Sequence, residues 1–345
     1  MPGVDAFIII GENIHCTRKV KRGGKRAITT DDGREAIAFE DPDGTRRSLP
    51  LPASLTGNDA GPLIAHVRCA AELALRGNDD DRRLAADFVQ YEARRQLEAG
   101  AHFLDVNVDE ISNDVETRNE AMRWIVPTVQ AVSDRPLSVD SSAIETLRVG
   151  LEAYDPDRAG RGMLNSVSLE RPEAAELAAE HHCHVVALPV SESGMPCGVG
   201  DRLANIALLV ERLTAANVAI EDIYVDPLVL AASTDPTAPQ NVLETIRQVR
   251  AKYPTIHIAG GHSNISHGLP MRRLLNAVWL ILAIEAGADA GIIDPLSIRP
   301  AALASMDRQS ESFKMAEAGL LGRDEFFIDF ITAARDGRLA DIHFD

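Results

Sequence analysis

Five short apolar segments of the sequence each end in polar residues that could contact a ligand. LSVD at 137–140 and YVD at 224–226 close on an aspartate. FLDVN at 103–107, MLNS at 163–166 and GGHSN at 260–264 close on or next to an asparagine. Enzymes with a parallel β-barrel build their sites from side chains at the carboxyl ends of the strands. The pattern therefore predicts a ligand site at strand ends.

The residue types indicate a flat ligand with alternating hydrogen-bond donors and acceptors. The carboxylate of Asp140 could accept two N–H donors from one edge of a heterocycle, as in recognition of the guanidine-like edge of a pterin. Asn165 offers one donor and one acceptor, and Asp226 supplies a second carboxylate. Any one of them could instead be the N-cap of a following helix, because Asp, Asn and Ser are preferred there. Coincidence at three strand ends is a weaker explanation than a shared site.

Apolar runs alternate with stretches of helical periodicity along the chain, and there are eight such pairs. Eight units favour a closed (β/α)₈ barrel of the TIM type, in class α/β, over an open sheet. Continuous apolar runs such as VVALPV fit strands that are buried on both faces. The expected strands are Phe7–Gly11, His102–Asn107, Pro136–Asp140, Gly162–Ser166, His184–Pro189, Ile223–Asp226, Thr255–Gly260 and Ala288–Ile293.

Two helices have clear ends and one connection is unusually long. The helical patterns Asp81–Ala99 and Met271–Ala286 each stop at a glycine in the C-cap position. Residues 12–79 hold far more than a normal strand-to-helix loop, including the basic run TRKVKRGGKR and a hairpin-like stretch at 36–52 that turns at Pro-Asp-Gly. We expect one barrel domain over residues 1–345, with 12–79 as a lid or docking insertion and a helical tail at 301–345.

Composition narrows the class of protein. A chain of 345 residues, 45% hydrophobic and 25% charged, can bury a large core. A formal charge of −17 disfavours nucleic acid as a partner. Neither a membrane span nor a signal peptide is evident, so we expect a cytoplasmic protein. The four cysteines form no CxxC pair, and HHCH at 181–184 precedes a strand, so no metal site is expected.

The segment 260–295 and the strand-end motifs together resemble the pterin-binding methyltransferases. This family includes methyltetrahydrofolate:corrinoid protein methyltransferases and the folate domain of cobalamin-dependent methionine synthase. The matching motifs are specific in combination and cover most of the chain outside 15–79 and the tail. They are IIIGENI at 8–14, FLDVNV at 103–108, LSVDSS at 137–142, MLNSVS at 163–168, DIYVDPLVL at 222–230, and GGHSNIS and AGADAGIIDP within 260–295.

The resemblance implies a role for each matching residue. Asp140, Asn165 and Asp226 are expected to bind the pterin edge, while Gly261 lets the backbone approach the ring. Asn264 is expected near N5 of the folate, where it and Asp226 assist catalysis. The remaining substrate-binding residues implied by the motifs are Asp105, Asn107, His267 and Arg272. For Asp105 and Asn107 a supporting role is as consistent as direct contact.

The implied reaction is transfer of a methyl group between N5 of tetrahydrofolate and the cobalt of a corrinoid, in either direction. The amine is a poor leaving group, so N5 must gain a proton or a strong hydrogen bond as its bond to the methyl group breaks. No Asp-x-His-x-x-Gly signature of a corrinoid domain is present. A separate corrinoid protein is therefore the expected partner, together with the folate substrate and a second copy of this chain in a homodimer.

Two features depart from the family pattern. His267 stands three residues after Asn264, where several family members have glutamine, and it could either donate a proton or pack at the rim of the site. The first motif reads GENIHCTR rather than GERIN and leads directly into the insertion.

Two other functions are compatible with parts of this pattern. Dihydropteroate synthase shares the barrel and pterin pocket, but its Lys and Ser-Arg motif is not visible here. A non-catalytic folate-binding protein predicts degraded pocket residues, whereas Asp140, Asn165, Asp226 and Asn264 are all present.

Overall fold

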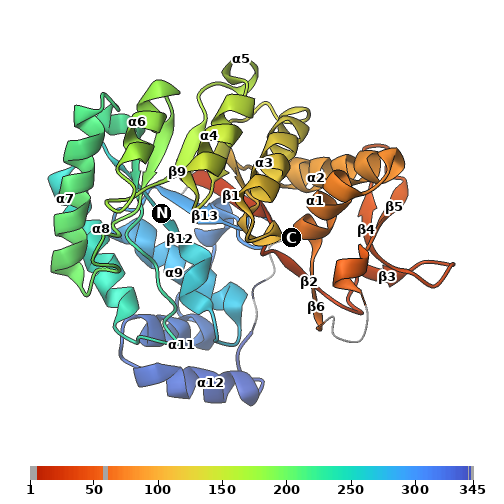
Figure 1. Cartoon of the computed structure of the whole chain (residues 1–345). Coiled ribbons are helices and arrows are strands. Elements are labelled where there is room, and N and C mark those ends of the chain that lie inside the picture. Colours follow the sequence, from red (N-terminus) through yellow and green to blue (C-terminus); the bar gives the residue numbers. More distant parts are fainter. Residues whose placement is uncertain (1–5, 57–60, 341, 343–345) are drawn as a thin grey trace. The chain divides into compact units, whose positions relative to one another are not determined.

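Eight parallel strands form a closed barrel in the order β1-β13-β12-β11-β10-β9-β8-β7 (Figure 1). The computed structural model describes residues 6–56, 61–340 and 342. The barrel confirms the predicted (β/α)₈ fold. Its strands are β1 (Ile8–His15), β7 (Phe103–Asn107), β8 (Leu137–Asp140), β9 (Met163–Val167), β10 (His184–Ala187), β11 (Ile223–Val225), β12 (His257–Gly261) and β13 (Ala290–Ile293).

The barrel strands are apolar because they are covered on both faces. All five residues of β7 and of β9 are buried, including their polar side chains. All eight predicted strands are present, and the main difference is that β1 continues four residues beyond its predicted end at Gly11, to His15. The apolar run stops at Gly11, but the ladder continues, since Cys16 N–H still donates to the Asn107 carbonyl at 3.0 Å.

Helices follow the strands and end where local signals predict. Asn78 caps α2 with its side chain in a reciprocal capping box with Asp81. Gly100 and Gly287 follow α2 and α9 with φ of 91° and 118°, which a residue with a side chain rarely adopts. The α-helices are α1 (His66–Arg76), α2 (Asp79–Glu98), α3 (Val115–Gln130), α4 (Ile144–Ala153), α5 (Pro156–Ala159), α6 (Glu173–Glu180), α7 (Val199–Ala215), α8 (Ala238–Lys252), α9 (Arg272–Ala286), α10 (Pro300–Leu303), α11 (Glu311–Leu320) and α12 (Ile328–Arg335).

Contacts divide the chain into two compact units. One comprises residues 11–165 and the other residues 1–10 with 166–345. In the second unit the tail 301–345 contributes α11 and α12, and α11 packs against α9. No helix in the described part of the chain is long and apolar enough to cross a membrane.

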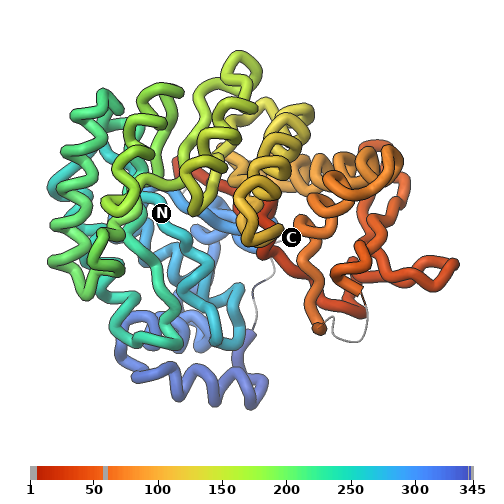
Figure 2. Tube along the Cα trace, in the orientation of Figure 1, coloured from red at the N-terminus to blue at the C-terminus, as the bar shows by residue number. Residues whose placement is uncertain are grey.

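The insertion carries two small antiparallel sheets. β2 (Lys19–Lys21) pairs with β6 (Leu63–Ala65), and β4 (Glu35–Glu40) lies between β3 (Ala27–Thr29) and β5 (Arg46–Pro50). The β4–β5 pair is the predicted hairpin, with Gly44 at φ 81° in its turn. β4 and β5 pack against α2, as the chain trace shows (Figure 2). A single helical turn, η1 (Ala53–Leu55), and then β6 lead into α1.

The arginines of the basic run hold the insertion to its own unit. Arg26 pairs with Glu92, whose side chain is 2% exposed, and lies over the rings of Phe88 and Tyr91. Arg22 pairs with Glu35 and donates to the Leu55 carbonyl at 3.1 Å. The three lysines of the run, by contrast, are exposed: Lys19, Lys21 and Lys25. The run is therefore part structural and part solvent-facing.

Candidate active site

Three neighbouring strands of the 11–165 unit place polar residues in one row. Asn107 of β7 stands opposite Asp140 of β8, and Asp140 stands opposite Asn165 of β9. Asn107 Nδ2 donates to Asp140 Oδ2 at 2.9 Å. The row continues through the backbone, because Ser141 N–H donates to the Asn165 carbonyl at 3.1 Å. Four of the predicted site residues, these three and Asp105, are brought together here.

Asp105 lies two residues before Asn107 and so on the same face of β7. It is 2% exposed, and Asn165 Nδ2 donates to its Oδ1 at 3.2 Å. Burial raises the pKa of Asp105 to about 6, and hydrogen bonds from its neighbours oppose this rise while the charge of Glu12 adds to it. Asp105 therefore supports Asn165 from beneath the row.

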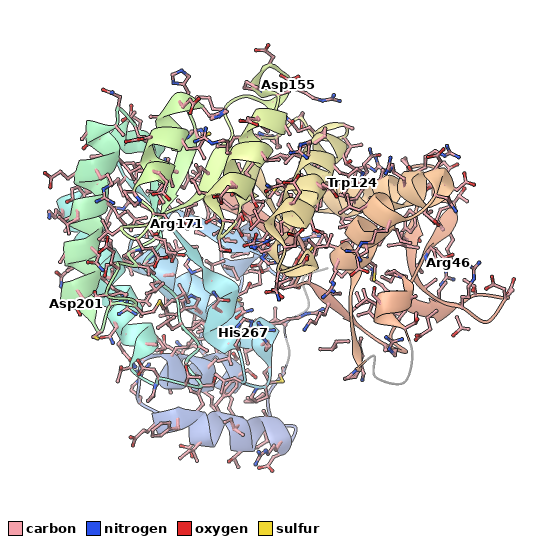
Figure 3. All side chains as sticks on the ribbon, in the orientation of Figure 1. Arg46, Trp124, Asp155, Arg171, Asp201 and His267 are labelled. Atoms are coloured by element: carbon pink, nitrogen blue, oxygen red, sulfur yellow. The ribbon has the colours of Figure 1, made fainter. Side chains whose placement is uncertain are left out.

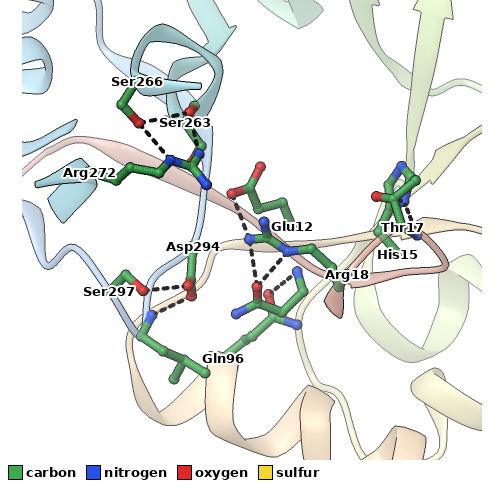
Figure 4. Close-up of polar contacts among 12 residues, drawn as sticks. Glu12, His15, Thr17, Arg18, Gln96, Ser263, Ser266, Arg272, Asp294 and Ser297 are labelled. Carbon is green, nitrogen blue, oxygen red and sulfur yellow. Dashed lines mark hydrogen bonds and ion pairs between the residues drawn. The ribbon is translucent and has the colours of Figure 1, made fainter. Parts of the chain in front are cut away.

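The extended end of β1 adds polar residues that the sequence analysis did not select. Arg18 Nη2 donates to Glu12 Oε1 at 2.7 Å and to Asn13 Oδ1 at 2.8 Å (Figure 4). His15 Nε2 lies 3.9 Å from Asp140 Oδ2. Burial, and next the charge of Arg18, lowers the pKa of His15 to about 4, so its ring is neutral near pH 7. The motif GENIH could have pointed to Glu12 and His15 as site residues. The apolar run that predicted the first strand ends at Gly11, before these two residues.

In the other unit Asp226 follows β11 directly. Its Oδ1 accepts the Leu228 N–H at 2.7 Å, and Leu228 has φ of 64°. Gly260 makes room for this turn, since a Cβ there would lie 2.8 Å from Val229 Cγ2. Burial raises the pKa of Asp226 to about 6, against the effects of the Leu228 N–H and the charge of Arg202. Asp226 thus titrates close to neutral pH.

The 3₁₀ helix η4 (His262–Ser266) begins where β12 ends and carries Asn264. A Cβ on Gly261 would lie 3.0 Å from Asn264 Nδ2, so the absence of a side chain at 261 lets the amide fold back over the strand end. The Asn264 residue is exposed, whereas Ile265 and Ser266 beside it are fully buried. Asn264 is thus placed to meet a ligand on a rigid support.

Arg272, at the start of α9, holds η4 in place. Its Nε donates to Ser266 Oγ at 3.0 Å and its Nη2 to the Ser263 carbonyl at 3.0 Å (Figure 4). Arg272 is one of the substrate-binding residues that the family motifs imply. These bonds give it a supporting part in positioning Asn264.

The two histidines of this segment have different environments. His262 is 1% exposed; its Nδ1 accepts the Trp279 N–H at 3.0 Å, so its proton lies on Nε2, 3.3 Å from the Ala290 carbonyl. Burial lowers the pKa of His262 to about 4. His267 is exposed (Figure 3), and its carbonyl accepts Ser233 Oγ at 2.6 Å. His262 is a core residue, and only His267 is accessible to a ligand.

Asp294 is a further strand-end carboxylate that the sequence analysis did not select. It follows β13 and accepts Ser297 Oγ at 2.5 Å and the Leu296 N–H at 3.0 Å (Figure 4). The run GIIDP carries the same signal as YVDP, an apolar strand that closes on aspartate. The HHCH segment, in contrast, starts β10: His184 Nδ1 lies 3.0 Å from Asp222 Oδ1 and its ring meets Tyr224 edge-on.

Comparison with known proteins places this arrangement in a family. A family model described as pterin binding enzyme matches residues 79–294. Methylcorrinoid:tetrahydrofolate methyltransferase of Eubacterium limosum is 31% identical over 260 residues, 74% of this chain and 90% of that protein. Methionine synthase of Mycobacterium leprae is 31% identical over 223 residues, 60% of this chain but 18% of that much longer protein.

A solved structure of a pterin enzyme has the same fold as this chain. Dihydropteroate synthase from Xanthomonas albilineans, in complex with 7,8-dihydropteroate, aligns with a TM-score of 0.53 at 18% identity over 66% of this chain and 86% of that one. The family model covers more than half of the chain and includes the strand ends of β7, β8, β9, β11 and β12. The resemblance seen in the sequence is confirmed, and the chain belongs to the pterin-binding enzyme family.

Proposed function

We propose that this protein is a methyltransferase that moves a methyl group between N5 of tetrahydrofolate and the cobalt of a corrinoid. The observation that carries the proposal is the match over nine-tenths of the length of an enzyme named for that reaction. The proposal is supported by Asp140 at the end of β8, Asp226 directly after β11, and Asn264 in η4, which follows β12. The likeness to dihydropteroate synthase lies at 18% identity and supports the shared fold alone.

We assign pterin recognition first to Asp140. The amide of Asn107 donates to one of its oxygens, which fixes the plane of the carboxylate. A fixed carboxylate can accept two parallel N–H bonds from the ligand edge without first losing side-chain entropy. Asn165, Asp226 and the Gly261 backbone are proposed to bind the remaining edge groups and the ring face, and His267 to line the rim.

Asn264 and Asp226 are proposed to act at N5. As the methyl group leaves for cobalt(I), the electron pair of the broken C–N bond stays on N5, which then takes a proton or a hydrogen bond. A carboxamide can donate to the unprotonated amine and, after rotation, accept from the protonated one. An ionised Asp226 stabilises positive charge at N5, and no side chain of the protein has to act as a nucleophile.

The corrinoid is proposed to arrive on a separate protein, because the Eubacterium limosum enzyme, which this chain matches over 90% of that enzyme's length, is named for a methylcorrinoid substrate. The homodimer and the cytoplasmic location expected from the sequence stay predictions, as does the role of residues 12–79 as a lid or docking segment.

Asp140→Ala tests the proposed substrate. The variant should bind tetrahydrofolate at least about 100-fold more weakly than the wild type, because two charge-assisted hydrogen bonds are lost together. Isothermal titration calorimetry at pH 7 measures this directly. Glu110→Ala, which removes an exposed carboxylate near the same strand ends, is the control and should bind normally. Equal affinity in Asp140→Ala and wild type argues against pterin binding at this residue.

Asn264→Ala separates catalysis from binding. Its contact with N5 should strengthen as the C–N bond breaks, so the rate of methyl transfer should fall by about 10²–10³ while the Kd for tetrahydrofolate rises much less. Single-turnover absorbance of methylcobalamin, with calorimetry alongside, gives both values. Proportional losses in rate and affinity mean that Asn264 only forms a wall of the pocket.

The pH profile tests Asp226. Its pKa of about 6 means that the ionised form grows as pH rises from 5 to 7. The kcat/KM for methyl transfer should rise across this range in the wild type, and Asp226→Asn should lower activity above pH 7 and remove the rise. Asp105→Asn is the matched control, because the pKa of Asp105 is also about 6. Asp105→Asn should keep the rise in kcat/KM. If the rise persists in Asp226→Asn and vanishes in Asp105→Asn, the titrating group is Asp105, and the proposed role of Asp226 is wrong.

The lysines of the insertion test the docking hypothesis. Replacing Lys19, Lys21 and Lys25 by glutamine should raise KM for an acidic corrinoid protein and flatten its salt dependence, because exposed charges act over a Debye length of about 8 Å. kcat and the melting temperature should not change. Arg26→Gln is the contrast: it leaves the buried Glu92 with only the longer bond from Arg95 Nη1, at 3.3 Å, and should destabilise the fold by roughly 2 kcal/mol. A collapse of kcat in the lysine variant, with KM unchanged, indicates a lid instead.

A further inference from the structure

Asp109 joins the ends of two strands through its carboxylate. It begins η2 (Asp109–Ile111), two residues after β7, and is half-buried. Its Oδ1 accepts Ser141 Oγ at 2.6 Å. Its Oδ2 accepts both the Ser142 N–H, at 2.7 Å, and Ser142 Oγ, at 2.8 Å. Both oxygens therefore bind the two residues that follow Asp140.

The backbone of Asp109 acts on Asp140 by a second route. Its N–H donates to Asn107 Oδ1 at 2.9 Å. A backbone N–H can only donate, so this bond fixes which end of the Asn107 amide is the oxygen. The Nδ2 end must then face Asp140, to whose Oδ2 it donates at 2.9 Å. The two routes from Asp109 thus reach Asp140 through Asn107 on one side and through Ser141 on the other.

Helix capping does not account for these bonds. α4 starts at Ile144, its N-cap is Ala143, and no side chain caps it. The N–H that Asp109 accepts belongs to Ser142, which precedes the N-cap. Ser141 Oγ in turn accepts the Ala143 N–H at 3.1 Å. The bonds of Asp109 therefore set the turn after β8 rather than the start of a helix.

We propose that Asp109 is a positioning residue that fixes the Asp140 carboxylate for the pterin edge. This inference rests on the proposed function, because it takes Asp140 to be the group that binds the ligand. Asp140 is the last residue of β8, and after the Ser141 N–H the chain leaves the strand ladder. The Asp109 carboxylate restrains this turn by binding Ser141 and Ser142. A shift of about 1 Å in such a group is enough to weaken its interaction greatly.

A double-mutant cycle on tetrahydrofolate affinity tests the proposal. Asp109→Ala should weaken binding by at least about tenfold. Asp109→Asn, whose amide nitrogen cannot accept a hydrogen bond, should give an intermediate loss. If Asp109 acts through Asp140, the double variant Asp109→Ala/Asp140→Ala should bind no more weakly than Asp140→Ala alone. Additive losses, or wild-type affinity in Asp109→Ala, overturn the proposal.

Asp114→Ala is the matched control, because Asp114 caps α3 through the Thr117 N–H and Oγ1 but has no bond toward Asp140. It should lose stability comparable to that lost by Asp109→Ala and keep wild-type affinity for tetrahydrofolate. Equal losses of affinity in both single variants mean that general destabilisation is the cause, and the positioning role is then wrong.

Amide hydrogen exchange gives a readout that does not need the folate. In Asp109→Ala the Ser141 N–H, which donates to the Asn165 carbonyl, should exchange at least about tenfold faster, although Asp109 does not bind it directly. Unchanged protection of Ser141 overturns the proposal even if affinity falls. If the wild type itself binds no tetrahydrofolate, the proposed function fails, and the exchange experiment still decides whether Asp109 holds the turn.

Discussion

The free energy required to remove carboxylates from water, at and near the ends of buried strands, determines how the candidate site is built. Asp105 lies within β7 and Asp226 lies directly after β11, and burial raises the pKa of each to about 6. Such groups persist in a fold only if donors satisfy them. The Asn165 amide serves Asp105 and the Leu228 N–H serves Asp226. The positions of neighbouring amides, turns and glycines follow from this requirement.

The same requirement prepares the site for a ligand. Side chains that already hydrogen-bond one another, such as Asn107 with Asp140, lose little conformational freedom when a flat heterocycle binds. η4, which Arg272 holds, does the same for Asn264, which is itself exposed while Ile265 and Ser266 beside it are buried. A methyl transfer in which no protein nucleophile takes part depends on such positioning and on electrostatics.

The insertion separates two uses of positive charge within ten residues. Arg22 and Arg26 have planar guanidinium groups that bind several partners at once, including a carbonyl and aromatic rings. They hold the small sheets to their own unit. Lys19, Lys21 and Lys25 make no such contacts with the residues that the structure describes and leave their charge in solvent, where it can act on an approaching partner.

Local patterns in the sequence determined the strands, the capped helices and the β4–β5 hairpin, because apolar runs, C-cap glycines and a Pro-Asp-Gly turn act within a few residues. They also predicted that Asp140, Asn165, Asp226 and Asn264 lie at or just after strand ends. The family motifs could be recognised because each joins such a residue to the apolar run before it. Only the tertiary structure decided that β1 reaches His15, that Arg272 supports η4, that His262 is a neutral core residue and that Asp109 binds the turn after Asp140. The end of β1, His262 and Asp109 depend on partners distant in sequence, which are Asn107, Trp279 and Ser141. Arg272 depends on how η4 folds back toward the start of α9. No short pattern encodes these neighbours.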